Sequence, residues 1–338
     1  LGCAQSGCAE DALKLFWEME SKHVKRTLVT YVGALKACSL LGQPENGRKI
    51  HECFLNSGMK ANLILKNALI DMFAKCGSLK DARKVFDAMS ERDVISWNAM
   101  IIGYAKHGHG REALTCLGKM MHENVSPNLV TLICVLKACA ISGSLEIGEG
   151  IYMEATMQGL LDKEVALGNA LVHMYAKCGA LRKARQAFDE LPVRDIASWT
   201  TLISGYSTHG QGVEAMRLFE RMKYEGCSPN EITFISVLKA CGNLGALHQG
   251  HIIDDLLRRR DFDVDIVLGT TLIEMYVNCG YLKDAYKVIT KLPSQNNVSW
   301  NAMIAGCAVY GDGDMMEKCL DKMMKEGLRP DQMGVTQI

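Results

Sequence analysis

The sequence has no excess of charge of either sign, because 38 Lys and Arg residues balance 38 Asp and Glu residues over its 338 positions. A protein that holds a polyanion by bulk charge needs a basic surplus, so any such contact has to come from individually placed side chains. A run of about 20 apolar residues, the length that spans a bilayer, is also missing. We therefore expect a soluble protein with no membrane partner.

Motifs for metal binding and catalysis are missing as well. None of the 14 Cys residues forms a Cys-x-x-Cys pair, which argues against a zinc ribbon or a dithiol redox site. His107 and His109, and also His248 and His251, have metal-like spacings, but no cluster of cysteines or carboxylates accompanies them. No Ser-His-Asp set or nucleotide-binding loop stands out. The segment is therefore predicted to have no metal, no cofactor, no small-molecule substrate and no enzyme activity.

The cysteines instead recur at equivalent places. Three precede a glycine and three follow the pair Lys-Ala; these are Cys76, Cys178 and Cys279, and Cys38, Cys139 and Cys241. A disulfide framework has no reason to repeat in this way, whereas a free cysteine is a good small core residue. We expect packed thiols in a reducing compartment.

Ten glycines recur at intervals that cycle in a fixed order. The intervals are 35, 35, 31, 35, 36, 31, 35, 35 and 31 residues, for Gly7, Gly42, Gly77, Gly108, Gly143, Gly179, Gly210, Gly245, Gly280 and Gly311. The larger unit is a triplet of 101 to 102 residues, which Trp97, Trp199 and Trp300 mark again. Such a period is the signature of a repeat architecture.

Each repeat has the pattern of two helices on either side of its glycine. Within residues 94–128, apolar residues at helical spacing form one stripe before Gly108 and another after it. Glycine takes a left-handed backbone cheaply, so it is expected to end the first helix. One hairpin cannot bury both stripes, so neighbours must stack. The predicted fold is all-α, a right-handed α-solenoid (superhelix) of about ten helix-turn-helix repeats of 31, 35 and 36 residues.

The motifs within these repeats resemble the pentatricopeptide repeat family, in its plant-type PLS class where P, L and S repeats alternate. NALIDMFAKCG at 67–77 looks like an S repeat, VISWNAMI at 94–101 like a P repeat, and VLKACA at 135–140 like an L repeat. Tetratricopeptide repeats, the rival assignment, have a fixed length of about 34 residues that does not fit this cycle.

The resemblance implies one solenoid over residues 1–331. Its divisions would be a partial P repeat at 1–27, L at 28–62, S at 63–93, P at 94–128, L at 129–164, S at 165–195, P at 196–230, L at 231–265, S at 266–296 and P at 297–331. Residues 332–338 would start an incomplete repeat. The chain begins at Leu1 without a starting Met or transit segment, so we expect a fragment of a longer protein.

By the same resemblance, each P or S repeat binds one base of single-stranded RNA. The reading pair would be a polar residue early in the first helix and the last residue of the repeat: Asn67 with Asp93, Asn98 with Asn128, Asn169 with Asp195, Thr200 with Asn230, Thr270 with Asn296, and Asn301 with Asp331. Side chains that reach splayed bases can read their hydrogen-bonding edges. The other interpretation is local helix-start chemistry, since Asp and Asn often cap helices.

The family's pairing rules imply uracil for Asn with Asp, a pyrimidine for Asn with Asn, and adenine for Thr with Asn. The expected RNA, 5′ to 3′, is then U, pyrimidine, any, U, A, any, A, U. The L repeats carry Val32, Ile133 and Ile235 at the reading place. Aliphatic side chains cannot discriminate base edges by hydrogen bonding. These repeats are interpreted as spacers or as docking surfaces for accessory editing factors.

Two further sets of residues have roles implied by the resemblance. Small aliphatic residues beside the reading residues would be wedged between bases, or would be ordinary core residues: Ile64, Ile95, Ala166, Ala197, Val267 and Val298. Lys75, Lys106 and Lys177 late in first helices would contact phosphates, whereas Thr208, Asn278 and Val309 replace lysine later in the chain. Few phosphate contacts predict a shallow salt dependence and weaker binding by the second half.

The resemblance also bears on cellular role. It implies the targeting module of an RNA-editing or RNA-processing factor in a mitochondrion or chloroplast. Many proteins of this class carry a deaminase-like domain with His-x-Glu and Cys-x-x-Cys zinc ligands, and none of these motifs is present here. The alternative function is a helical scaffold whose concave face binds protein partners.

Overall fold

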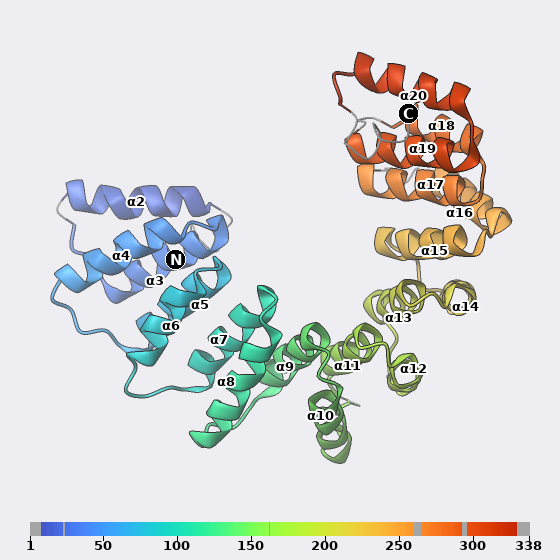
Figure 1. Cartoon of the computed structure of the whole chain (residues 1–338). Coiled ribbons are helices and arrows are strands. Elements are labelled where there is room, and N and C mark those ends of the chain that lie inside the picture. Colours follow the sequence, from blue (N-terminus) through green and yellow to red (C-terminus); the bar gives the residue numbers. More distant parts are fainter. Residues whose placement is uncertain (1–7, 23, 162, 260–264, 293–295, 330–338) are drawn as a thin grey trace. The chain divides into compact units, whose positions relative to one another are not determined.

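A computed structural model describes residues 8–22, 24–161, 163–259, 265–292 and 296–329. Every regular element in these ranges is an α-helix (Figure 1). The chain divides into two compact units, Leu1–Cys178 and Gly179–Ile338, called the N-terminal and C-terminal units below. Asp331 and residues 332–338 lie outside the described residues, as does Gly7.

Helices of two kinds alternate along the chain. The first helices of the repeats are α3 (Leu28–Leu41), α5 (Leu63–Lys75), α7 (Val94–Lys106), α9 (Leu129–Ser142), α11 (Val165–Lys177), α13 (Ile196–Thr208), α15 (Glu231–Leu244), α17 (Ile266–Asn278) and α19 (Asn297–Tyr310). The second helices are α2 (Ala9–Ser21), α4 (Pro44–Asn56), α6 (Leu79–Asp87), α8 (Gly110–His122), α10 (Leu145–Met157), α12 (Leu181–Asp189), α14 (Gly212–Tyr224), α16 (Leu247–Arg259), α18 (Leu282–Ile289) and α20 (Gly313–Lys325).

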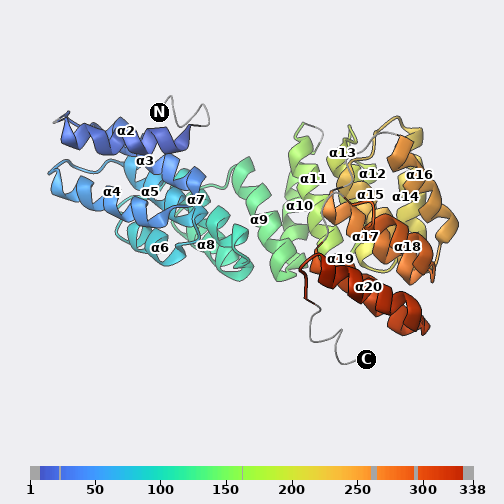
Figure 2. The same ribbon diagram turned by 90° about the horizontal axis from the view of Figure 1, so that it is seen from above.

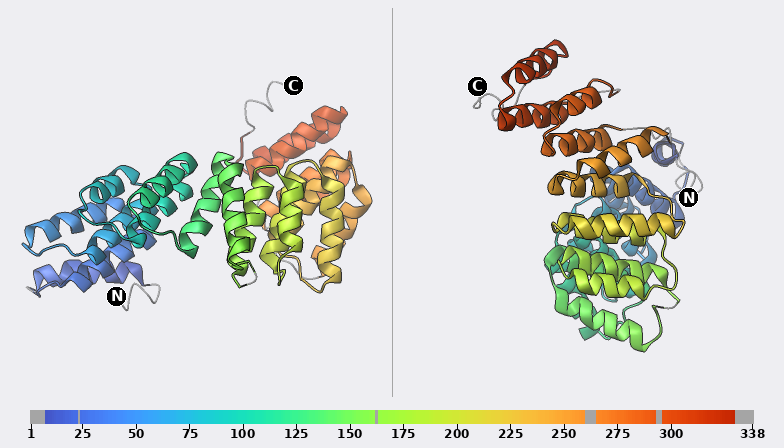
Figure 3. Two further views of the ribbon diagram at one scale, coloured as in Figure 1. Left: turned by 90° about the horizontal axis from the view of Figure 1, so that it is seen from below. Right: turned by 90° about the vertical axis from the view of Figure 1, so that its right-hand side faces the viewer.

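Within each unit, every first helix packs against the next first helix. In the N-terminal unit the order is α3, α5, α7, α9 and α11, with α2 lying along α3 (Figure 2). In the C-terminal unit α13, α15, α17 and α19 follow one another in the same way (Figure 3). Each hairpin therefore buries its apolar stripes against its sequence neighbours, as an α-helical repeat solenoid requires.

The short repeats differ from the long ones in their second helices. α6 has 9 residues, α12 has 9 and α18 has 8, whereas α4, α8, α14 and α20 have 13 each. A loss of about four residues is close to one helical turn of 3.6 residues, so the remaining side chains keep the same face towards the core. This explains why the 31-residue interval can alternate with longer ones.

The repeated glycines end the first helices, as predicted. Gly42, Gly143 and Gly245 take φ angles of 65°, 70° and 63°, and Gly77 and Gly108 take 79° and 82°. These are left-handed conformations that a residue with a Cβ atom adopts only with strain. The chain can therefore reverse into the second helix of the hairpin at each of these glycines.

Trp97 and Trp199 join neighbouring hairpins. Trp97 is fully buried and packs edge-on against Phe86 of the preceding repeat, with ring centroids 4.7 Å apart. Trp199 and Phe188 repeat this contact at 4.6 Å. Arg92 donates from Nε to the Phe86 carbonyl across 3.2 Å, so it caps the end of the short second helix beneath the aromatic pair.

The recurring cysteines pack as free thiols within the described residues. The Cys76 thiol donates to the Cys38 carbonyl across 3.6 Å, and the Cys178 thiol to the Cys139 carbonyl across 3.7 Å. Burial, with a contribution from the neighbouring thiol, raises the pKa of Cys38 to about 12. A thiol that stays protonated is a poor nucleophile, which fits a packing role.

Among the described residues, no helix is both long enough and apolar enough to cross a membrane. In the same part of the chain, no three His, Cys, Asp or Glu side chains gather into a group that could hold a metal ion.

Candidate nucleic-acid interface

One groove in the N-terminal unit is lined by several of the residues that were predicted to contact RNA. It has a volume of about 560 Å³ and is open to solvent along α3, α5 and α7. Its lining comprises Val32, Leu63, Ile64, Asn67, Ala68, Asp71, Asp93, Ile95, Asn98, Ala99, Ile102, Asn128 and Val130. Two complete reading pairs and two of the exposed aliphatic residues thus share one surface.

The positions that line the groove follow from helix geometry. Counted from the start of each first helix, most of them are second, fifth, sixth and ninth residues, which lie on one face at helical spacing. We call the fifth residue the reading residue, and the residue just before the next first helix the cap residue. For α5 these are Asn67 and Asp93.

Asn67 and Asp93 form a direct hydrogen bond. The Asn67 Nδ2 atom donates to Asp93 Oδ1 across 3.1 Å and lies 3.4 Å from Oδ2. Asp93 is also the N-cap of α7, since its Oδ1 accepts from the Ser96 amide across 2.8 Å. Burial works to raise the pKa of Asp93, but the hydrogen bonds from Ser96 and Asn67 outweigh it and the pKa falls below its ordinary value. Asp93 is therefore an ionised acceptor at neutral pH.

Asn98 and Asn128 repeat this arrangement one repeat further on. The Asn98 Nδ2 atom donates to Asn128 Oδ1 across 3.2 Å. Asn128 caps α9 by accepting from the Thr131 amide across 3.0 Å. The side-chain oxygen of Asn128 is thus used within the protein. Its side-chain N–H groups are the hydrogen-bonding groups that it can offer to a ligand.

The C-terminal unit holds two threonine versions of the site. Thr200 donates from Oγ1 to Asn230 Oδ1 across 3.4 Å, and its hydroxyl lies 2.8 Å from the Thr233 hydroxyl. Thr270 donates to the Ile266 carbonyl across 2.7 Å, and its hydroxyl lies 2.8 Å from that of Ser299. Thr270 reaches Asn296 through Ser299, whose amide and hydroxyl both lie 2.9 Å from Asn296 Oδ1.

The reading residues are deeply placed. Asn67, Asn98, Thr200 and Thr270 are only 7–8% exposed, and Asn169 and Asn301 are half-buried. Asn67 and Asn98 line the groove in this way and do not project as free tips. A base therefore has to enter between the neighbouring side chains to reach them. Asn169 and Asp195 belong to different units, and the partner of Asn301, Asp331, lies outside the described residues.

Helix capping is part of the same constellation. Asp93, Asn128, Asp195, Asn230 and Asn296 each extend the backbone before a first helix and accept a hydrogen bond from its third residue. The capping interpretation therefore holds for all five. It leaves the second Asp93 oxygen and the amide nitrogens of the Asn caps for other contacts.

The small aliphatic residues are exposed, so their alternative interpretation as ordinary core residues is wrong. Ile64 is 66% exposed, Ile95 is 59%, and Val267 and Val298 are 56% and 59%. Ala166 and Ala197 are exposed as well. Val29, Val130 and Ile232 are the second residues of α3, α9 and α15 and are also exposed. Each first helix thus presents one apolar side chain to solvent on its first turn, which a stacked base could cover.

The three lysines that the sequence analysis assigns to phosphates are all exposed but are not equivalent. Lys75 pairs with Asp71 at 2.8 Å, which offsets its charge. Lys106 donates to the Lys75 carbonyl across 3.3 Å. Lys177 lies near His173, where burial and then the charges of Lys177 and Lys137 lower the pKa of the imidazole. Lys137 therefore adds a cation that the sequence analysis overlooks.

A set of buried hydroxyls was also missed from sequence. Ser96, Thr131, Ser198, Thr233 and Ser299 are the third residues of their first helices, and each has an exposed fraction of 0%. Four of them touch a reading residue of the preceding repeat. The signal that could have found them is their recurrence three residues after the cap residues.

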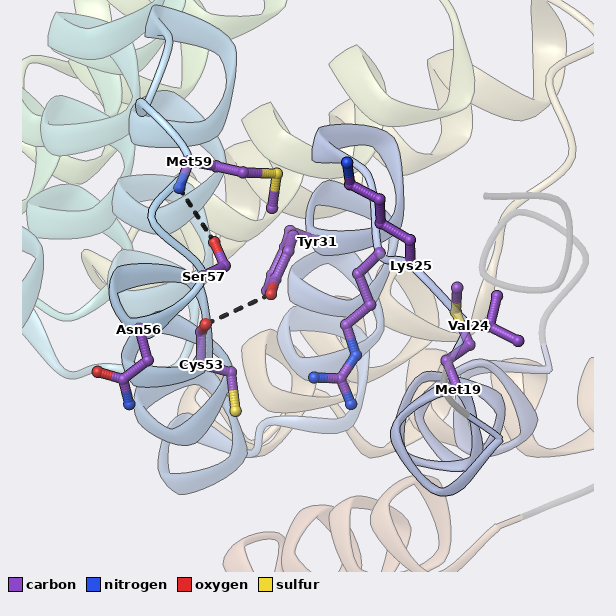
Figure 4. A pocket seen from close by; sticks show the side chains of 9 residues that line it. Met19, Val24, Lys25, Tyr31, Cys53, Asn56, Ser57 and Met59 are labelled. Atoms are coloured by element: carbon purple, nitrogen blue, oxygen red, sulfur yellow. Dashed lines mark hydrogen bonds between the residues drawn. The ribbon is translucent and has the colours of Figure 1, made fainter.

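A second hollow of about 400 Å³ lies between α2, α3 and α4 (Figure 4). The Tyr31 hydroxyl in it donates to the Cys53 carbonyl across 3.4 Å. Arg26 donates to the Phe16 carbonyl across 3.1 Å and lies 4.3 Å from the centre of the Phe16 ring. These contacts fix the packing of the first two hairpins, and no predicted site residue lines the hollow.

Stacked helix pairs, each packed on its sequence neighbours, define an α-helical repeat protein. Family models agree: the PPR repeat family matches residues 92–141 and 194–243, and the PPR repeat matches residues 1–24, 65–94, 169–196 and 298–328. The chain belongs to the pentatricopeptide repeat (PPR) family.

Two relatives from Arabidopsis thaliana are similar over nearly the whole chain. The chloroplastic pentatricopeptide repeat-containing protein At4g18520 is 34% identical over 97% of this chain and 53% of its own length. The mitochondrial protein At2g03380 is 34% identical over 100% of this chain and 49% of its own. The chain thus spans about half the length of the curated relatives it matches.

Solved structures show the same fold. Maize PPR10 superposes with a TM-score of 0.76 at 18% identity, over 99% of this chain and 54% of that one. PPR10 in complex with an 18-nt psaJ RNA element gives a TM-score of 0.75 at 19% identity, over 99% and 55%.

Proposed function

We propose that this chain binds single-stranded RNA along its first helices, with one base placed at each P or S repeat. The observation that carries the proposal is the groove in which two reading pairs lie between exposed aliphatic side chains. Flat apolar faces of bases can cover Ile64 and Ile95 while base edges meet the polar floor. The RNA complex of the similarly folded PPR10 supports this reading.

The hydrogen-bonding groups at each site support the bases expected for it. Asn67 has an amide N–H left over, and Asp93 is an ionised acceptor. Uracil offers a carbonyl to the first and its N3–H to the second. The side-chain oxygen of Asn128 already accepts from Thr131 and from Asn98, so Asn128 can offer only its N–H groups to a base. Asn98 uses one N–H for this contact and has a second one left. Two donors suit the acceptors on a pyrimidine ring.

The proposed target remains U, pyrimidine, any, U, A, any, A, U, in the 5′ to 3′ direction. It uses Asn169 with Asp195 and Asn301 with Asp331 for two of its uracils, by the same rule. The direct test is the affinity of the chain for this oligonucleotide against a scrambled sequence of equal composition. Equal affinities would refute specificity while leaving general RNA binding open.

The biological setting belongs to this proposal. The 31, 35 and 36-residue intervals and the short α6, α12 and α18 support a PLS-type array with the repeat divisions given above. Relatives named as chloroplastic or mitochondrial support an organelle as its location. We place the chain as the targeting part of an RNA-editing or RNA-processing factor. Crosslinking followed by sequencing of the bound RNA, from plastids and from mitochondria, tests both statements.

Accessory proteins would dock on L repeats. An apolar hollow of about 370 Å³ between α14 and α16, which includes the half-exposed Val213 and Ile252, lies on the L repeat at 231–265 and its neighbour. An accessory factor that binds there should be lost when both residues become Asp, with RNA affinity unchanged. A pull-down with the wild-type and substituted chains checks this.

The rival function is a scaffold whose concave face binds a protein segment. Such a groove would need a continuously apolar or continuously acidic lining, whereas this lining mixes three asparagines and two aspartates with aliphatic residues. Filter binding to single-stranded RNA, set against selection from a peptide library, separates the two functions. Selection of tight peptides that displace no RNA would favour the scaffold.

A further inference from the structure

We infer that each base-reading site has a third member, a buried hydroxyl on the third residue of the next first helix, which orients the reading residue. For Asn67 it is Ser96, and for Asn98 it is Thr131. The inference rests on the proposed function, because it concerns how the reading residue is presented to a base. Ser96 and Thr131 are positioning residues, since neither is exposed to a ligand.

The sequence itself links the two positions. Wherever the reading residue is polar and the next helix start is described, the third residue of that helix carries a hydroxyl: Asn67 and Ser96, Asn98 and Thr131, Asn169 and Ser198, Thr200 and Thr233, Thr270 and Ser299. Wherever the reading residue is aliphatic, that third residue is leucine: Val32 and Leu65, Ile133 and Leu167, Ile235 and Leu268. Capping alone cannot explain this, because Asn62 and Asp265 cap their helices through the backbone amides of Leu65 and Leu268.

The contacts show what the hydroxyl does. Thr131 donates from Oγ1 to Asn98 Oδ1 across 2.7 Å, and Ser96 donates to Asn67 Oδ1 across 2.7 Å. The two hydroxyl oxygens also accept hydrogen bonds from backbone amides. The Asn128 amide donates to Thr131 Oγ1 across 3.0 Å, and the Asp93 amide donates to Ser96 Oγ across 3.3 Å. The cap residue offers each hydroxyl a second acceptor, Asp93 Oδ1 at 2.8 Å from Ser96 and Asn128 Oδ1 at 3.0 Å from Thr131. The amide oxygen of the reading residue is the nearer acceptor in both cases, at 2.7 Å.

The cap residue fixes the other end of the amide. An ionised carboxylate only accepts, so the nitrogen of Asn67 has to face Asp93 and its oxygen has to face Ser96. With both ends held, the remaining hydrogen-bonding group at the groove is an N–H. Loss of the hydroxyl would free the amide to turn and present its oxygen, which would weaken the preference for base carbonyls.

Thr131→Val tests this with little change in shape, and Thr131→Ser is its matched control. Wild-type preference is measured first, as the ratio of affinities for pyrimidine and purine at the base facing Asn98. We expect Thr131→Val to reduce that ratio about tenfold, as the loss of one well-placed hydrogen bond would, and Thr131→Ser to retain it. Preference at the base facing Asn67 should not change in either variant.

The experiment distinguishes a failure of base reading from a failure of the positioning role. If the wild-type chain shows no preference at this base, the proposed base reading is wrong there. If the wild type discriminates and Thr131→Val discriminates equally, the positioning role is overturned and base reading stands.

A gain of function covers the case in which Thr131→Val does not fold. Val32→Asn with Leu65→Thr rebuilds the Asn98, Asn128 and Thr131 arrangement around the existing cap Asn62. The double variant should acquire a pyrimidine preference of several-fold at a base where the wild type has none, and Val32→Asn alone should not. Equal preference in the single and double variants would show that the hydroxyl is dispensable.

Discussion

The hydroxyl of Thr131 lies 2.7 Å from the amide oxygen of Asn98, on the first helix of the preceding repeat. A contact that stabilises the start of one helix thus also sets the direction of a side chain on another. Because the same contact recurs at Asn67 with Ser96, base-reading geometry and repeat stacking are coupled. A change at the junction should therefore affect both specificity and stability, while a change in the groove surface should affect binding alone.

Thr200→Asn should change the base that its repeat prefers. With Asn at position 200, this site has the same three side chains as the site of Asn98, Asn128 and Thr131. The expected preference for adenine should therefore change to a preference for a pyrimidine. We expect a shift of about tenfold in the ratio of the two affinities, which matches one base discriminated by hydrogen bonds. A panel of oligonucleotides that differ only at this base measures it. Thr115→Asn, on the exposed face of α8, is the control and should change nothing.

Lys106→Ala and Lys177→Ala should each reduce the salt dependence of RNA affinity. For single strands, each phosphate contact contributes about 0.7 to the slope of log affinity against log salt concentration. Lys75→Ala should have a smaller effect because Asp71 already pairs with Lys75 at 2.8 Å. Titrations at four salt concentrations give the slopes. Lys119→Ala on α8 serves as the control, and a slope that drops as much there would mean that bulk charge dominates.

Ile95→Ala and Ile101→Ala should separate binding from folding. Ile95 is 59% exposed at the groove, so its loss should weaken RNA binding and leave the melting temperature nearly unchanged. Ile101 is fully buried one turn and a half further along α7, and its truncation should cost about 2–5 kcal/mol of stability. Thermal melts and RNA titrations of both variants check the contrast. A large loss of stability in Ile95→Ala would indicate that Ile95 packs in the core.

Much of the fold was visible in the sequence because repetition made local signals redundant. Gly77 and Gly108 take the left-handed conformation that a helix end requires, as their spacing predicted. The depth of the site was not visible. Asn98 is only 7% exposed because Asn128 and Thr131, at the start of the next first helix, close around it. Such burial depends on how neighbouring repeats approach each other, and the pattern within one repeat contains no information on that approach.

The sequence left two interpretations open for Ile95 and its equivalents, a contact with bases or a place in the core. An isoleucine on the first turn of a helix fits an apolar stripe as well as it fits a ligand surface, and periodicity cannot separate the two. The second position of each first helix falls outside the face that packs on neighbours, which only the stacked helices reveal.

The stability of the chain should fall as the pH is lowered through the range where two half-buried histidines titrate. Burial lowers the pKa of His173 below its ordinary value of 6.5, assisted by the charges of Lys177 and Lys137, and burial likewise lowers the pKa of His51. The unfolded chain therefore takes up protons at about pH 6.5 while the folded chain does not. Stability is fully present above that pH and is lost as the pH falls towards the folded-state values. His173→Gln should flatten this dependence without changing stability at pH 8, and denaturant midpoints from pH 8 to pH 5 measure it. If the denaturant midpoint depends on pH equally steeply in the variant, a group other than His173 takes up the proton.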